Sequence, residues 1–410
     1  MKFLHVLHGY PPNVGGVQNL FQQLSERLVH EYHDQVTVFT TNAYSNYHFW
    51  QADTRTMPAG TEQRNGVTVR RFPVFNRFSW LRLNLARVAY KFKLPYHDWL
   101  RTLYNGPIIP GLAQAIAQAE ADVVVASAFP LLHMAYAKRG AQQSGKPFLF
   151  YGALHPADHW GFSRNMIFQA IAQADGYLAN TTFERDFLVE RRIDPAKISL
   201  IGAGVDVAKL AEANGRSWRQ QHHLENVPII AFIGQQAEHK GIDLLIQAMP
   251  QIWQTVPNAH LVIAGKPTAY ATHLHQLAAA LPAEQQARIK ILDLLPEVEK
   301  NNLLAACDLL ALPSRFESFG IVLVEAWACG KPVIGANVGG VAALIQEGVD
   351  GLLVPVGSTP ALANAILKLL QDEPLRAQLG TAGKQKATER YSWEAVTAAY
   401  RTACIQAIHR

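Results

Sequence analysis

The chain has 410 residues, too many for one ordinary hydrophobic core, and this length predicts two large domains. Hydrophobic residues make up 49% of the sequence and charged residues 17%, which excludes the disordered and collagen-like classes. Three separated cysteines favour a reducing compartment and therefore a cytoplasmic protein, and the modest net charge of +5 gives no reason to expect a nucleic-acid partner.

Strand-like runs alternate with helical patterns from the first residues onward. Residues 3–7 predict a buried strand rather than the apolar region of a signal peptide, and residues 17–32 place apolar side chains on one helix face. A phrase that ends a helix and begins a strand recurs at 119–127, 173–181 and 305–314. This alternation is typical of α/β domains with doubly wound parallel sheets.

A domain boundary is expected near residue 205, where glycines follow a strand and a polar stretch begins. Residues 1–205 then form the first domain and residues 206–391 the second. The last helix, about 392–410, fits either domain by its periodicity. No stretch reaches the ~18 consecutive apolar residues of a membrane-spanning helix, so we expect a soluble or peripherally bound protein.

A basic stretch within the first domain, residues 70–93, mixes cations with aromatic and aliphatic side chains and contains no acid. Such a helix is typical of proteins that rest on an anionic membrane surface. A helix packed on its own domain, with solvated cations, explains the pattern equally well. The membrane interpretation assigns lipid contact to four basic residues, Arg82, Arg87, Lys91 and Lys93.

Several familiar phosphate and metal signatures are absent from the sequence. There is no P-loop, no complete dinucleotide fingerprint and no Asp-x-Asp pair for a metal bound to a diphosphate. His155 and His159 stand four residues apart like metal ligands, but no third ligand lies nearby in the sequence. We therefore expect neither a metal nor a cofactor.

The segment 313–358 carries the most chemistry. Glu317 is predicted in a loop after a strand, and Glu325 within a helix that begins near Ser318. The free amides at the start of that helix, with the helix dipole, attract a diphosphate or the polar face of a sugar. By spacing alone, an ordinary helix cap followed by a solvated glutamate is the simpler interpretation.

Glu317 and Glu325, with seven residues between them and the segments 330–340 and 350–355 behind them, resemble the donor-site signature of the family 4 retaining glycosyltransferases. The similarity extends over nearly the whole chain. It implies the glycosyltransferase B fold, in which two Rossmann-like domains face each other across a cleft, and a last helix that crosses back onto the first domain.

The resemblance also implies roles for residues of the second domain. Glu317 would contact donor-sugar hydroxyls and Glu325 the ribose, while the amides of Phe319 and Gly320 face the sugar or the phosphates. Lys240 would bind the diphosphate. Where the family has an arginine beside it, this chain has Gln235.

Three explanations of Gln235 stay open. Another cation substitutes for the arginine, or glutamine suffices with a weaker grip on the leaving group, or the protein binds its donor with little turnover. A second departure is Ala343, where the family often carries an acid.

In the first domain, Gly15 and Gly16 fit a loop that approaches an anionic ligand, although a tight turn between strand and helix explains them equally well. The resemblance assigns this loop to the donor phosphates and the acceptor. His155 follows a strand, where a histidine is often structural, and the resemblance implies a contact with the donor sugar.

These features and the resemblance together predict a metal-independent glycosyltransferase, and the resemblance alone implies that it retains the anomeric configuration. It would move a hexose from a nucleotide-sugar donor to a hydroxyl of a glycan, a lipid or a small molecule, in glycolipid or cell-surface polysaccharide synthesis. The catalytic candidates are His155, Lys240 and Glu317, and the departing phosphate can take the acceptor proton. The alternatives are a sugar-nucleotide epimerase, a phosphorylase, or a weakly active nucleotide-sugar-binding protein.

Overall fold

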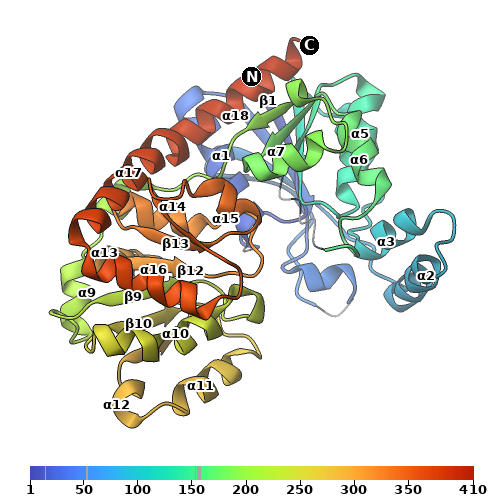
Figure 1. Ribbon diagram of the computed structural model, residues 1–410. Helices are drawn as coiled ribbons and strands as arrows, with labels where there is room; N and C mark the ends of the chain where they lie inside the picture. Colours follow the sequence, from blue (N-terminus) through green and yellow to red (C-terminus); the bar gives the residue numbers. More distant parts are fainter. Residues whose placement is uncertain (14, 52–53, 153, 155–157) are drawn as a thin grey trace. The chain divides into compact units, whose positions relative to one another are not determined.

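The computed structural model describes residues 1–13, 15–51, 54–152, 154 and 158–410. The chain divides into two compact units (Figure 1). Unit 1 comprises Met1–Ile201 with Thr397–Arg410, and unit 2 comprises Gly202–Val396. Each unit is built on a parallel sheet flanked by helices, which confirms the expected fold class. The expected domain limits at about 205 and 392 stay a prediction, because compactness does not show that a unit folds alone.

The sheet of unit 1 has eight strands in the order β3-β4-β2-β1-β5-β6-β7-β8. The strands are β1 Lys2–Val6, β2 Gln35–Thr41, β3 Gly60–Arg64, β4 Val67–Phe72, β5 Val123–Ser127, β6 Phe148–Tyr151, β7 Gly176–Ala179 and β8 Ile198–Leu200. All neighbours pair in parallel except β3 and β4. Because β1 lies between β2 and β5, the strand order reverses between β1 and β5.

Helices follow the strands of unit 1 in chain order. They are α1 Gly16–Tyr32, η1 Asn46–Phe49, α2 Ser79–Lys91, α3 His97–Asn105, α4 Leu112–Gln118, α5 His133–Ser144, α6 Asn165–Ala172, α7 Thr182–Val189 and η2 Pro195–Lys197. The last helix, α18 Trp393–Ile408, packs on unit 1 with its second half. There the Tyr400 hydroxyl lies 2.9 Å from His5 Nε2, and Arg401 pairs with the buried Asp34 at 2.8 Å.

The sheet of unit 2 has six parallel strands in the order β11-β10-β9-β12-β13-β14. They are β9 Ile229–Ile233, β10 His260–Ala264, β11 Ile289–Leu292, β12 Leu309–Leu312, β13 Val333–Ala336 and β14 Gly351–Val354. Strands β9 and β12 are apolar and buried at every position, as expected for the middle of a sheet covered on both faces. The strand order reverses between these two strands.

The helices of unit 2 cover both faces of that sheet. They are α8 Val207–Ala211, α9 Gly215–Gln221, η3 Glu238–Lys240, α10 Ile242–Thr255, α11 Ala271–Ala279, α12 Ala283–Gln286, α13 Glu297–Ala306, α14 Ile321–Ala328, α15 Gly339–Leu344, α16 Thr359–Gln371 and α17 Glu373–Tyr391. Helix α14 is apolar almost all round because it lies between other elements and contacts α17. Within the described part of the chain, no helix combines the length and the apolar character needed to cross a bilayer.

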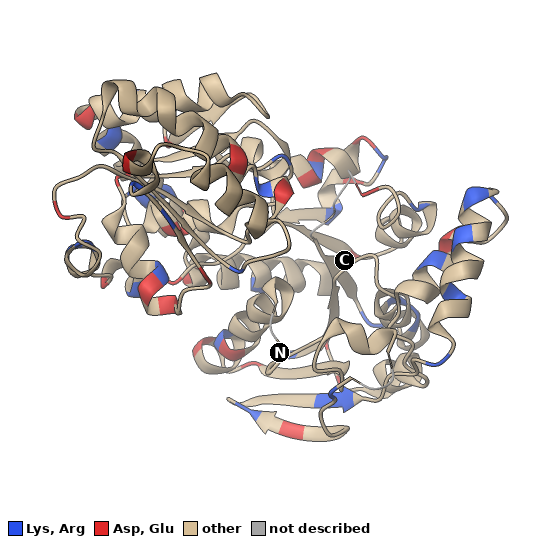
Figure 2. Cartoon of the chain, turned by 90° about the horizontal axis from the view of Figure 1, so that it is seen from below, with Lys and Arg blue, Asp and Glu red and all other residues tan. Residues whose placement is uncertain are grey.

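The basic stretch 70–93 begins at the end of β4 and contains α2, and Lys and Arg positions are blue in Figure 2. The inner stripe of α2 consists of Ala86, Ala89 and, unexpectedly, Arg82, which is only 8% exposed. The Arg82 guanidinium donates hydrogen bonds to the carbonyl oxygens of Phe49 and Leu103, both at 3.2 Å. The assignment of Arg82 to lipid contact or to solvent is therefore wrong, because its guanidinium is buried and donates to backbone carbonyls inside the fold.

Candidate functional site

The strand-order reversal of unit 2 brings two predicted residues together. Lys240 ends η3 in the segment after β9, and Glu317 lies in the loop after β12. Lys240 Nζ lies 2.5 Å from Glu317 Oε2, and the two side chains are 17% and 15% exposed. Open α/β sheets bind ligands at this position, beyond the carboxyl ends of the strands. The pair therefore places a cation and an anion, largely shielded from water, where a ligand is expected.

The two loops are held together by close backbone contacts. Gly241 has φ 68°, and a β-carbon there would lie 2.2 Å from the Pro313 carbonyl oxygen, so only glycine fits. The Arg315 amide donates to the His239 carbonyl oxygen at 2.8 Å. Lys240 and Glu317 consequently belong to one rigid constellation although 77 positions separate them.

Arg315 was missed by the sequence analysis. Its guanidinium forms a bidentate pair with Asp243, at 2.6 and 3.0 Å, and also donates to the Glu238 carbonyl oxygen. The hydrogen bond to Asp243 raises the pKa of Arg315. Arg315 thus joins the loop after β12 to the start of α10. Its partner lies 72 positions away, which no local pattern reveals.

Helix α14 begins at Ile321, three residues later than the sequence predicts. Gly320 precedes it with φ 84°, a left-handed conformation that interrupts the helix and favours glycine. The Phe319 side chain is buried against Tyr391, with ring centroids 5.7 Å apart, so it belongs to the core. Only the backbone of Phe319 and Gly320 is left to meet a ligand.

Glu325 lies on α14 and has a partner that the sequence did not reveal. Lys300 of α13 places Nζ 2.6 Å from Glu325 Oε1. A carboxylate offers about four acceptor positions, so this ion pair leaves room for a hydroxyl. Glu317 and Glu325 therefore have separate cations.

Gln235 is exposed, directly after Gly234. The next residue, Gln236, is fully buried and donates to the carbonyl oxygens of Gly265 and Leu292, both at 2.9 Å. This side chain ties the loops that follow β9 and β10 to the last residue of β11. Lys266, in the second of these loops, is exposed and forms no ion pair with the described residues.

In unit 1, Gly15 and Gly16 lead into α1. A β-carbon at Gly15 would lie 2.3 Å from Gln18 Oε1, whereas one at Gly16 would meet nothing within 4 Å. A side chain at Gly15 would therefore displace the Gln18 amide, whereas one at Gly16 would be accommodated without a shift. The prediction for His155 lies outside the described residues. The adjacent Leu154 amide donates to Glu184 Oε1 at 2.9 Å.

Glu184 is a buried carboxylate that the sequence analysis overlooked. It also accepts hydrogen bonds from the Asn180 amide at 2.9 Å and from the Tyr177 hydroxyl at 2.7 Å. Several donors to one carboxylate compensate for its burial. Glu184 fixes Leu154, the residue before His155.

Two buried histidines, also unforeseen, lie at the strand-order reversal of unit 1. The ring centroids of His8 and His133 are 5.8 Å apart, and in neither ring does Nδ1 have a hydrogen-bond partner among the residues that the structure describes. His133 Nε2 donates to the Ser127 carbonyl oxygen at 2.7 Å, and His8 Nε2 contacts Gln18 at 3.0 Å. Burial lowers the pKa of His8 to about 4 and that of His133 to about 3, so both rings are neutral at pH 7.

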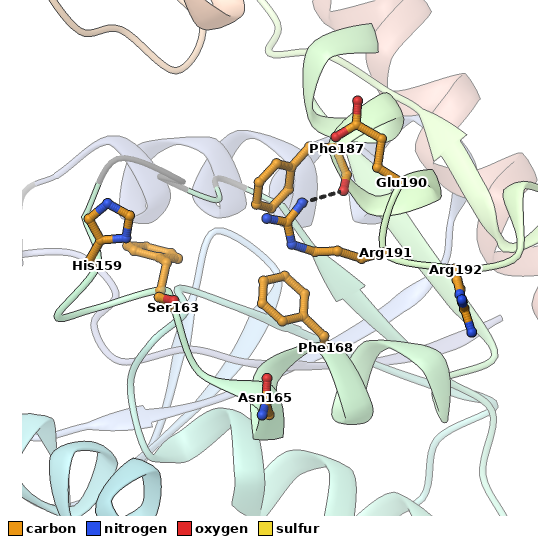
Figure 3. A pocket seen from close by; sticks show the side chains of 9 residues that line it. His159, Ser163, Asn165, Phe168, Phe187, Glu190, Arg191 and Arg192 are labelled. Carbon is orange, nitrogen blue, oxygen red and sulfur yellow. Dashed lines mark hydrogen bonds between the residues drawn. The ribbon is translucent and has the colours of Figure 1, made fainter. Parts of the chain in front are cut away.

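A cavity of about 450 Å³ lies on unit 1 between α6 and α7 (Figure 3). The Arg191 guanidinium lies between the rings of Phe168 and Phe187, and its carbon is 3.5 Å from the Phe187 centroid. Glu190 and Arg192 also line it. Because two guanidinium groups and one carboxylate line the cavity, its charge favours neither an anionic nor a cationic ligand. We assign no function to this cavity.

Among the described residues, histidine, cysteine, aspartate and glutamate side chains nowhere gather in a group of three that could hold a metal ion.

Comparisons with known families cover most of the chain. The model "Glycosyl transferase 4-like domain" matches residues 15–204, and the model "Glycosyl transferases group 1" matches residues 215–386. D-inositol 3-phosphate glycosyltransferase of Salinispora tropica is 35% identical over 245 residues, which are 55% of this chain and 50% of that protein. The chain thus spans about half the length of the curated relatives it matches.

Solved structures resemble the fold over nearly the full length. Anabaena HepE, crystallised with UDP, has a TM-score of 0.72 at 20% identity, covering 98% of this chain and 99% of that one. Sucrose-phosphate synthase of Thermosynechococcus elongatus has a TM-score of 0.71 at 21% identity, covering 99% of both chains. The fold is therefore the glycosyltransferase B fold. The chain belongs to the glycosyl transferase family described by the group 1 and 4-like models, which confirms the resemblance inferred from the sequence.

Proposed function

We propose that the protein is a retaining glycosyltransferase that moves a hexose from a nucleoside-diphosphate sugar to an acceptor hydroxyl. The contact between Lys240 Nζ and Glu317 Oε2, 2.5 Å long and at the strand-order reversal of unit 2, carries this proposal. Family membership and fold support it, since this position is where open α/β sheets bind nucleotides.

The site must first stabilise the negative charge of the leaving diphosphate. The Lys240 ammonium has three N–H donors, so it can contact a phosphate oxygen without fully releasing Glu317. The amides at Phe319 and Gly320 add donors aimed at the same charge. As Lys240 turns toward the diphosphate, Glu317 gains acceptor capacity for the hydroxyls of the donor sugar.

Transfer with retention follows from this charge distribution. The bond between the sugar and the diphosphate weakens, positive charge develops on the sugar ring, and the acceptor hydroxyl attacks from the face that the diphosphate leaves. The departing phosphate oxygen accepts the proton of that hydroxyl, so catalysis is mainly positioning and electrostatic stabilisation. The reaction as proposed uses no metal, and Glu317 is not a nucleophile.

The other site candidates take supporting roles. Glu325 binds the ribose through an oxygen that Lys300 leaves free, His155 contacts the donor sugar, and the loop of Gly15 and Gly16 approaches the phosphates and the acceptor. The Anabaena protein bound to UDP makes a uridine nucleotide the first donor to test. The relatives named for D-inositol 3-phosphate make a phosphorylated polyol the first acceptor to test.

Gln235 leaves the diphosphate with one cation fewer than the family usually provides. We propose that the free ammonium of Lys266 substitutes for it, because Gln236 holds the loops after β9 and β10 together and its amide donates to the Lys266 carbonyl oxygen at 2.9 Å. The remaining alternative, which Gln235 itself favours, is a nucleotide-sugar-binding protein of low activity.

One assay separates these functions. Purified protein is incubated with UDP-glucose, GDP-mannose and ADP-glucose, with and without inositol phosphate, and products are identified by mass and by anomeric NMR. Nucleoside diphosphate formed together with an α-linked product supports the transferase. An isomerised donor supports an epimerase, a sugar phosphate formed with inorganic phosphate supports a phosphorylase, and binding without product supports the binding protein.

The same assay tests the site. Glu317→Gln should abolish transfer, whereas Glu225→Gln, at an exposed position of unit 2, serves as the matched control and should leave it unchanged. Equal activity of Glu317→Gln and the wild type would contradict the site assignment.

A further inference from the structure

Helices α2 and α3 of unit 1 and the residues beside them expose an unusual number of large apolar side chains. Six of them define what we call the α2–α3 surface: Phe78, Trp80, Leu85, Val88, Phe92 and Tyr96. Trp80 is 65% exposed, Phe92 64% and Tyr96 79%. Single exposed apolar residues are common, but a concentration of this size marks an interaction site.

The α2–α3 surface is also strongly basic. Arg77, Arg87, Lys91 and Lys93 are exposed there and form no ion pair with the described residues. The only acid between residues 65 and 105 is Asp98, which Arg101 binds at 2.6 Å. The surface therefore combines aromatic rings with uncompensated positive charge.

We propose that the α2–α3 surface docks on an anionic lipid bilayer. Its aromatic and aliphatic side chains enter the boundary between headgroups and acyl chains, while the four cations bind lipid phosphates. Aromatic and basic residues in alternation are the composition that such a boundary favours. Charge complementarity selects a bilayer with negative headgroups over a neutral one.

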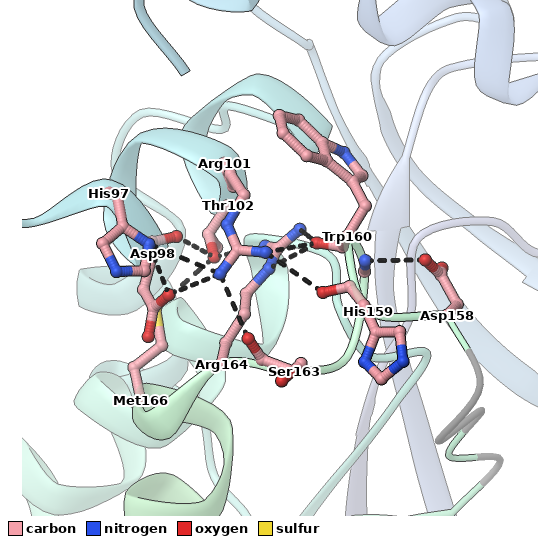
Figure 4. A network of polar contacts seen from close by, with 11 residues as sticks. His97, Asp98, Arg101, Thr102, Asp158, His159, Trp160, Ser163, Arg164 and Met166 are labelled. Atoms are coloured by element: carbon pink, nitrogen blue, oxygen red, sulfur yellow. Dashed lines mark hydrogen bonds and ion pairs between the residues drawn. The ribbon is translucent and has the colours of Figure 1, made fainter. Parts of the chain in front are cut away.

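Contacts beneath α2 and α3 hold this surface in place. Arg101 is fully buried, and its guanidinium donates to the carbonyl oxygens of Trp160 at 2.9 Å and Ser163 at 3.1 Å (Figure 4). Arg164 donates to Thr102 Oγ1 at 2.6 Å. The Tyr90 ring of α2 covers Arg101, with the guanidinium carbon 4.4 Å from the ring centroid.

This network links the α2–α3 surface to the segment 158–164, which follows His155 along the chain. A bilayer bound to the surface therefore also fixes that segment relative to the membrane. The consequence for catalysis rests on the proposed function: the segment after His155, which that proposal places at the donor sugar, is then held near the membrane surface. Docking itself does not depend on that function.

Sedimentation of the full chain with vesicles tests the proposal. The wild type should sediment with vesicles of phosphatidylcholine and phosphatidylglycerol, and much less with phosphatidylcholine alone. The triple variant Arg87→Glu, Lys91→Glu, Lys93→Glu should bind the anionic vesicles at least roughly tenfold more weakly, because its cations are reversed. Phe78→Ser with Trp80→Ser should also weaken binding. Arg82 is left unchanged, because its replacement would disturb the fold.

The matched control reverses three exposed cations of unit 2, with Lys368→Glu, Lys384→Glu and Arg390→Glu, and should bind like the wild type. Circular dichroism melting confirms that every variant folds. The proposal is overturned if the wild type ignores anionic vesicles, or if the control loses binding as much as the α2–α3 variant.

Sedimentation velocity without lipid tests whether a second copy of the chain covers the α2–α3 surface instead. If the wild type is a dimer and the α2–α3 variants are monomers that still bind vesicles, the surface belongs to a second copy, and the bilayer proposal fails. Release of nucleoside diphosphate from a soluble donor, measured on the same variants, should be unchanged. This readout separates failure of docking from failure of the proposed glycosyl transfer.

Discussion

The two sheets of the protein carry chemically different groups at their points of strand-order reversal. In unit 2, Lys240 and Glu317 form a charged pair, whereas in unit 1 His8 and His133 are neutral and buried. A partly exposed ion pair can exchange one partner for a charged ligand. Neutral imidazoles offer only neutral hydrogen bonds. We infer that the ion pair of unit 2 meets the charge of the leaving group, whereas the buried histidines of unit 1 contribute no charge to a ligand site.

Removal of the charge in unit 2 gives the largest expected effect. Lys240→Met should lower kcat roughly 10²- to 10³-fold, because the leaving diphosphate loses a preorganised cation. Transfer from a nucleotide sugar, followed by release of nucleoside diphosphate, measures it. Lys368→Met on α16 is the matched control, and a Lys240→Met enzyme with normal kcat would remove Lys240 from the mechanism.

Acidification should destabilise the protein through buried histidines of unit 1. Burial lowers the pKa of His8 to about 4, and those of His5 and His133 to about 3, from the ordinary 6.5. Between pH 6.5 and about 4, these histidines are therefore protonated in the unfolded chain but stay neutral in the folded chain. The free energy of unfolding should fall as the pH drops through this window, by about 1.4 kcal/mol per pH unit for each histidine.

Melting temperatures recorded from pH 7.5 to 5 check this stability prediction. His8→Asn should reduce the slope between pH 6.5 and 5 by about 1.4 kcal/mol per pH unit, since it removes one of the histidines that the folded chain keeps neutral. An unchanged slope in His8→Asn would mean that His8 is charged in the folded protein, and the contrast between the two sheets would disappear.

The hydrogen bond between Tyr400 and His5 gives a smaller effect. Tyr400→Phe leaves His5 Nε2 buried without its partner and should lower the free energy of unfolding by about 1–3 kcal/mol. Chemical denaturation followed by fluorescence measures the loss. Tyr32→Phe is the control, and a loss equal to that of the control would show that this bond contributes nothing to docking α18.

The smallest expected effect concerns the missing arginine. Gln235→Arg should raise kcat by roughly three- to tenfold, because a bidentate cation is added to the phosphate site. Lys266→Ala should lower kcat in the wild type by a similar factor, and by less in the Gln235→Arg background. Additive effects of the two changes would show that Lys266 does not substitute for the arginine.

The fold could be predicted because it depends on periodicity. Apolar runs such as residues 229–233 predict buried strands, and the spacing of apolar residues in 17–32 predicts a helix, from the local sequence alone. The exact start of α14 could not be predicted, since it depends on the left-handed conformation of Gly320. Lys240 and Glu317 were recognised from motifs, but their contact is a product of the sheet order.

Other site features follow from long-range packing that leaves no local trace. Lys300 of α13 pairs with Glu325 of α14, and Arg315 pairs with Asp243, which lies 72 positions before it in the sequence. For Arg82, the local sequence is misleading rather than silent. Its neighbours in the sequence predict a solvated cation, yet the backbone carbonyls of Phe49 and Leu103 provide a buried site for it.

The inward-facing Arg82 also determines how α2 meets a membrane. Many amphipathic segments are unstructured in water and become helical only on lipid, so ordering entropy weakens their affinity. Here the guanidinium joins α2 to carbonyls of η1 and α3 before any lipid is present. Binding should therefore proceed as a rigid-body encounter, with no gain in helical circular dichroism when vesicles are added.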